Sequence, residues 1–180
     1  KDTDEALKVF SDQQVREPFL GMTESNGILG VSIVMYGPMG VFNKTPAKTP
    51  EDLRGKKYRV FAAPPEIETM NAWGATGVPM ALGEVGTALQ QGTIDGAQTG
   101  ITVAYNLKFY DFVKGATETN HSIITSFGGV SKVWFDQLPG DLQTAIIEEA
   151  RGVEPELWEW QKGEIDKGTQ AWNEITNGGV

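Results

Sequence analysis

Short apolar runs alternate with amphipathic segments over residues 53–99, and this pattern predicts strand, helix, strand, helix and strand in order. Strands separated by helices are typical of a parallel α/β sheet, in which ligands bind beyond the carboxyl ends of the strands. Arg59 lies at the end of the first strand and Thr99 just past the last, so we expect both on the ligand side. The three expected strands cover residues 57–61, 77–81 and 94–98.

Two longer apolar, β-branched runs bracket this block, at residues 28–36 and 121–131, and both are predicted to be buried strands. Such bracketing is what a chain that crosses into a lobe and back out produces. We therefore expect three parts. We also expect the lobe outside the central block to be incomplete in this chain. The three parts are a first-lobe remnant with a hinge strand at 1–36, a ligand-binding α/β lobe at 37–120, and a hinge strand with C-terminal helices at 121–180.

Helical patterns flank these strands at both ends of the chain. Residues 4–20 carry a ragged apolar face, and a long helix is expected from Asp141 past residue 170. Gly152 and Pro155 predict a kink in that helix. The final Asn-Gly-Gly segment, residues 177–179, is expected to form a flexible tail.

Composition removes several classes of function. The net charge is −9 and the 15 basic residues are scattered, so nucleic-acid binding is not expected. Cysteine is absent and His121 is the single histidine, which argues against disulfides, thiolate chemistry and a resident metal or other cofactor. Runs of 18 apolar residues are also absent, so no direct membrane insertion is expected.

Few titratable residues are placed for catalysis. Glu66 and Glu68 are interpreted as charges on a solvated helix face, and His121 as a packing or hydrogen-bonding residue. Asp95 is expected to cap a turn. An α/β enzyme, which needs a cluster of such groups at the strand ends, is the less favoured alternative to a binding protein.

Residues 49–60, TPEDLRGKKYRV, resemble the DLKG-x-K-x-R signature of the solute-binding proteins of tripartite ATP-independent periplasmic (TRAP) transporters, of the dicarboxylate-binding (DctP) type. The resemblance extends from about residue 25 to 172. The further matching segments, in chain order, are Trp73-Gly74-Ala75, Val78-Pro79-Met80-Ala81, Gly83-Glu84-Val85, residues 87–96, residues 108–112, Asn120-His121 and residues 138–143.

The resemblance implies a periplasmic-binding-protein-like fold: one nearly complete α/β lobe with hinge strands, a long C-terminal helix and part of a second lobe. It also implies that the chain lacks an N-terminal part. The implied function is periplasmic capture of an organic acid, without catalysis, and its delivery to the permease subunits of a TRAP transporter. A sensor or scavenging protein of the same fold, without a permease, is the alternative.

The family's selectivity arginine falls on Arg59, whose guanidinium offers two parallel donors to a carboxylate and stays charged when desolvated. Thr99 stands where the family commonly has Asn. Met39 stands near the second arginine of sugar-acid binders, and Leu82 replaces a common aromatic residue. With Phe61 and Phe127, Met39 and Leu82 are expected to line a pocket for a smaller or more apolar carboxylate. The sequence does not name the acid.

Overall fold

A computed structural model describes residues 3–180, so the first two residues of the expected 1–36 segment lie outside it. The chain divides into two compact units. The five-stranded unit comprises residues 38–122 and 164–180, and the two-stranded unit comprises the described residues up to 37 together with 123–163. Residues 164–180 therefore belong with the central block. The expected lobe boundaries remain a prediction.

The five-stranded unit carries a mixed sheet in the order β4-β3-β5-β2-β6. β3 pairs in parallel with both β4 and β5, whereas β2 is antiparallel to β5 and β6. The predicted strand–helix succession over 53–99 is confirmed, with Pro79 in the edge strand β4, where a missing backbone donor is tolerated. The strands are β2 (Gly40–Asn43), β3 (Lys57–Val60), β4 (Thr76–Pro79), β5 (Gly96–Thr99) and β6 (Gly115–Thr117).

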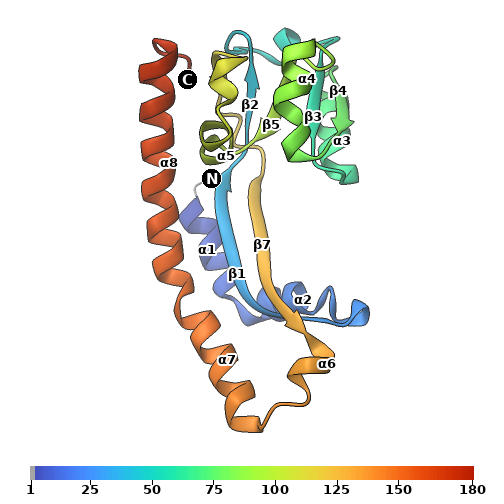
Figure 1. Cartoon of the computed structure of the whole chain (residues 1–180), viewed down its shortest axis with the longest axis vertical. Helices are drawn as coiled ribbons and strands as arrows, with labels where there is room; N and C mark the ends of the chain where they lie inside the picture. Colours follow the sequence, from blue (N-terminus) through green and yellow to red (C-terminus); the bar gives the residue numbers. More distant parts are fainter. Residues whose placement is uncertain (1–2) are drawn as a thin grey trace. The chain divides into compact units, whose positions relative to one another are not determined.

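Helices follow the strands of this unit in the chain (Figure 1). Residues 101–111 form two helical pieces, because Lys108 adopts a left-handed conformation with φ 55° between them. The helical elements are η2 (Pro50–Leu53), α3 (Pro64–Ala72), η3 (Leu82–Glu84), α4 (Val85–Gln91), α5 (Ile101–Asn106), η4 (Phe109–Asp111) and the last part of α8 (Glu154–Thr176).

Two apolar clusters fill this unit, and alternation along the strands assigns them to opposite faces of the sheet. One face carries Phe42 and Ala97, which pack with α4, and the other carries Val41 and Tyr58. Gly96 lies in the central strand β5 close to the Phe42 carbonyl and 2.6 Å, measured from an ideal Cβ, to the Tyr58 ring. A side chain at this position would therefore collide with the sheet.

The last helix completes the core of the five-stranded unit. Trp172 of α8 is fully buried, packs edge-on against Phe42 at 5.0 Å between ring centroids, and donates from Nε1 to the Lys114 carbonyl at 3.0 Å. The expected flexible tail is wrong, because the Ala116 amide of β6 donates to the Gly179 carbonyl at 2.6 Å. The tail thus satisfies backbone groups beside the sheet instead of remaining free.

The two-stranded unit pairs β1 with β7, which run side by side in Figure 1. The expected helix over 4–20 is two helices, since Asp12 accepts from the Gln14 amide and starts a second one. The predicted break of the long C-terminal helix is confirmed, at Val153. The elements are α1 (Thr3–Ser11), α2 (Gln13–Gly21), η1 (Glu24–Asn26), β1 (Ile28–Pro38), β7 (Ile123–Ser131), α6 (Lys132–Phe135), α7 (Gly140–Gly152) and the start of α8.

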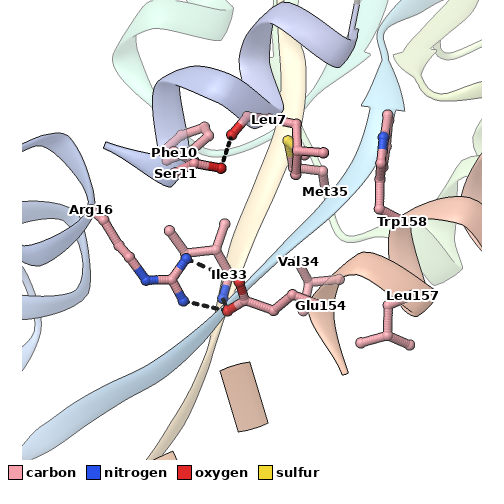
Figure 2. Close-up of a pocket in the computed structure, with 10 residues that line it drawn as sticks. All are labelled: Leu7, Phe10, Ser11, Arg16, Ile33, Val34, Met35, Glu154, Leu157 and Trp158. Atoms are coloured by element: carbon pink, nitrogen blue, oxygen red, sulfur yellow. Dashed lines mark hydrogen bonds and ion pairs between the residues drawn. The ribbon is translucent and has the colours of Figure 1, made fainter. Parts of the chain in front are cut away.

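An ion pair ties three elements of this unit together in a small, largely apolar pocket (Figure 2). Arg16 of α2 binds both carboxylate oxygens of Glu154, the first residue of α8, at 2.9 and 2.5 Å. The Ile33 amide of β1 donates to the same carboxylate at 2.7 Å. Both charged side chains are less than 15% exposed, so the interaction with the partner replaces hydration that each charge has lost.

We expect Glu154→Gln to lower the free energy of unfolding by about 2–3 kcal/mol, because the mutation leaves the Arg16 guanidinium desolvated without an anionic partner. Urea denaturation monitored by circular dichroism measures this loss. Glu159→Gln in the same helix is the matched control. Its pair with Lys162 is exposed, so its expected cost is below about 0.5 kcal/mol. Equal losses in the two variants would contradict the prediction.

Candidate functional site

Arg59 is the most buried charged side chain near the ends of the parallel strands, with 3% of its surface exposed. Its Nε donates to the Met80 carbonyl at 3.0 Å, and its Nη1 lies 3.4 Å from the Gln98 carbonyl. The guanidinium carbon stacks 4.4 Å from the centre of the Phe61 ring. These contacts fix the guanidinium but use only part of its five donors, so the remainder can serve a carboxylate.

Thr99 lies on the same face of the sheet as Arg59. The pairing of β3 with β5 places Arg59 opposite Ala97, and alternation returns Thr99 to that face two residues later. The Thr99 hydroxyl is fully buried and has no hydrogen-bond partner among the described residues. An unpaired buried polar group costs about 1–3 kcal/mol, which a bound ligand would recover.

Gln98 connects Arg59 to a second, negative charge. Its backbone carbonyl faces Arg59, whereas its fully buried side-chain amide donates to Glu66 Oε2 of α3. Burial raises the pKa of Glu66, opposed by the Gln98 hydrogen bond and the positive charge of Arg59. Burial lowers the pKa of Arg59, opposed by the negative charge of Glu66. Through Gln98, the Arg59 guanidinium and the Glu66 carboxylate thus belong to one hydrogen-bonded network.

His121 extends this network. The Gln98 amide nitrogen, which can only donate, lies 2.8 Å from His121 Nε2, so that ring nitrogen accepts. The proton then resides on Nδ1, which donates to the Thr119 hydroxyl at 2.7 Å, and Thr119 donates onward to the Met39 carbonyl at 3.2 Å. We assigned this tautomer from the network. Burial lowers the pKa of His121, consistent with a neutral ring.

The predicted site residues lie in different elements, and the structure brings some of them together. Arg59 and Phe61 are in contact, and Thr99 shares their face of the sheet. Met39 is 2% exposed and its sulfur accepts from Ser122 at 2.8 Å, which leaves little surface for a ligand. Leu82 is half-buried at the start of η3, after β4. Phe127 belongs to the two-stranded unit, where it packs edge-on against Phe19. The six-residue ligand site stays a prediction.

The sequence analysis missed Glu66 and Gln98. Glu66 was interpreted as a solvated charge, but it is half-buried and bonded to Gln98. Its position in the first turn of a helix that follows a parallel strand was the available signal, because that turn lies at the ligand edge of the sheet. Glu68, two residues further on, is exposed as expected.

Other features of the described residues add little to this site. A cavity of about 220 Å³ in the five-stranded unit is lined by Trp73, Thr117 and Thr119 among others, but by none of the predicted site residues. Residues 3–180 hold no group of three or more His, Cys, Asp or Glu side chains that could bind a metal ion. Within the same range, every helix is too short or too polar to cross a membrane.

Comparison with known proteins defines the class. Residues 1–178 match the family described as bacterial extracellular solute-binding protein, family 7 (DctP). This chain belongs to that family.

Individual relatives agree with this assignment. The chain is 31% identical to the 2,3-diketo-L-gulonate-binding periplasmic protein YiaO of Escherichia coli, over 84% of this chain and 46% of the relative. It is 26% identical to a TRAP periplasmic solute-binding protein of Pseudomonas putida solved with bound D-glucuronate, with a TM-score of 0.92 over 97% of this chain and 57% of that one. A Shewanella oneidensis protein solved with succinate matches at 25% identity and TM-score 0.89, covering 96% and 56%.

The chain thus spans roughly half the length of these relatives. The resemblance identified from the motifs is confirmed, and so is the fold that it implied, an α/β unit with a mixed sheet and a long C-terminal helix. The relatives are named for solute binding and none of the three for catalysis.

We expect the stability of the protein to fall as the pH drops below about 6.5, the ordinary pKa of histidine. The folded-state pKa of His121 lies below that of the unfolded chain, so the unfolded chain takes up the proton first and protonation favours unfolding. Melting temperatures between pH 8 and pH 5 measure the effect.

His121→Gln is the reference for this measurement, since the chain has no other histidine. Glu66 contributes in the opposite direction, because its raised pKa makes the folded state bind the proton more tightly above about pH 4.5. The difference between the wild-type and His121→Gln curves isolates the histidine. A difference that does not change with pH would refute the predicted shift.

Proposed function

We propose that this protein captures an organic acid in the periplasm and delivers it to the membrane permease subunits of a TRAP transporter. The observation that carries the proposal is the buried Arg59 guanidinium, held by two backbone carbonyls with donors left over. A fixed, desolvated guanidinium is a strong receptor for a carboxylate, because the fork of parallel N–H groups matches both oxygens.

Family membership supports the class of ligand and the location. Relatives in this family are named for binding 2,3-diketo-L-gulonate or were solved with D-glucuronate or succinate, and each of these molecules is an organic acid. In our proposal Arg59 binds the carboxylate and the unpartnered Thr99 hydroxyl completes its coordination. Phe61 keeps the guanidinium in place, and Leu82 contacts the rest of the ligand.

The proposed role is binding without catalysis. Conversion of a ligand would require a nucleophile or a proton-transferring group aimed at it. The titratable groups connected to Arg59 through Gln98 are Glu66 and His121, and both are engaged by the Gln98 amide. This arrangement favours recognition and release of an unchanged acid.

Arg59→Ala in the full-length gene product is expected to reduce carboxylate affinity at least about 100-fold, the equivalent of about 3 kcal/mol or more for a desolvated ion pair. Arg59→Lys is expected to weaken binding by about tenfold or more, since an ammonium cannot reproduce the fork. A thermal-shift screen of organic acids identifies a ligand, and isothermal titration calorimetry then measures its affinity.

Arg54→Ala is the matched control, because Arg54 is exposed five residues earlier and should leave affinity unchanged. Thr99→Val should cost less than Arg59→Ala, because it removes one neutral hydrogen bond. Wild-type affinity in Arg59→Ala would overturn the site, and the absence of binding by any acid in the library would overturn the function.

A further inference from the structure

The proposed carboxylate site contains an acidic side chain as well as an arginine, and the family assignment does not explain the acid. Arg59 supplies donors, but Gln98, whose backbone carbonyl lies 3.4 Å from Arg59 Nη1, also binds an acceptor, the Glu66 carboxylate, through its side-chain amide. Glu66 is half-buried and its Oε2 is held by the Gln98 amide, so the carboxylate is fixed in position at this site. Its other oxygen makes no hydrogen bond among the described residues.

The side chain of Gln98 independently indicates that this site has acceptors for a ligand donor. Its amide nitrogen has partners in Glu66 and His121, but its carbonyl oxygen Oε1 is buried and unpartnered in this part of the chain. Rotating the amide by 180° would not remove the problem, because it would set a carbonyl oxygen against the Glu66 carboxylate. The unpaired group is therefore an acceptor that lacks a donor.

The charges decide which ligand fits. A monocarboxylate on Arg59 leaves Glu66 as the excess charge, which a hydroxyl or ammonium donor on the same ligand would satisfy. A dicarboxylate would place its second anionic group in the field of Glu66, where like charges repel in a partly desolvated site. Glu66 thus strengthens the binding of a ligand that carries a donor and weakens the binding of one that carries a second carboxylate.

We propose that the ligand is a monocarboxylic acid with a hydroxyl or ammonium group, which binds Arg59 through the carboxylate and Glu66 through the donor. Gln98 positions the Glu66 carboxylate and provides Oε1 as a second acceptor for the same donor. This inference rests on the proposed function, since it presumes that Arg59 binds a carboxylate. It narrows the ligand class by excluding simple dicarboxylates.

Two matched sets of acids test the inference by titration calorimetry on the full-length gene product. Butanoate, 4-hydroxybutanoate, 4-aminobutanoate and succinate differ only in the group at C4, and gluconate and glucarate differ only at C6. We expect the acids with a donor to bind at least about tenfold more tightly than butanoate, and gluconate at least about tenfold more tightly than glucarate. The stronger of the hydroxyl and amino acids identifies the donor.

Glu66→Gln tests the residue itself, since it keeps the shape and removes the charge. It should weaken the acids with a donor, strengthen succinate and glucarate, and bring each pair to within about threefold. Glu68→Gln, in the exposed part of the same helix, should leave all six affinities as in the wild type. Equal melting temperatures of the two variants establish that both are folded.

The outcomes separate this inference from the proposed function. Succinate or glucarate binding as tightly as its hydroxy partner overturns the inference, and so does unchanged selectivity in Glu66→Gln. Failure of every acid with a donor overturns it as well. In each of these cases the proposed function survives if some other carboxylate binds in an Arg59-dependent manner.

Discussion

The hydrogen-bonded network at the carboxyl ends of the parallel strands depends on Gln98. Its backbone carbonyl faces the Arg59 guanidinium and its side-chain amide binds Glu66 and His121, so one residue fixes a cation, an anion and a neutral imidazole. One residue can do this because its backbone carbonyl accepts from Arg59, while the two N–H groups of its side-chain amide donate to Glu66 and His121. Moving Gln98 would disturb all three groups at once.

The fold was largely readable from the sequence because its signals are local. Alternating apolar runs, proline after strand ends and glycine at helix ends located β3, α3, β4, α4 and β5 within a few residues. The interruption at Lys108 could not be predicted from the sequence, because a left-handed lysine has no sequence signature comparable to glycine. The packing of Gly179 beside β6 was missed because it joins segments more than 60 residues apart.

Only part of the candidate site could be predicted from the sequence. Arg59 was proposed as a ligand residue from a motif and from its place at a strand end, both of which are local properties. Glu66 and Gln98 were not found, because a glutamate in a helix and a polar residue in a short strand have ordinary local patterns. Their role follows from their proximity at the carboxyl ends of the strands. Burial removes water there and makes each charge depend on a specific partner.

The position of Trp172 has a consequence for how the protein is made. The indole that fills the space against Phe42 comes 130 positions later in the chain than its partner. Contacts this distant in sequence form late, because the intervening loop must close first. While the chain is being synthesised, Phe42 of β2 lacks this packing partner until α8 has emerged from the ribosome. The apolar core of the five-stranded unit is therefore complete only after α8 has been made.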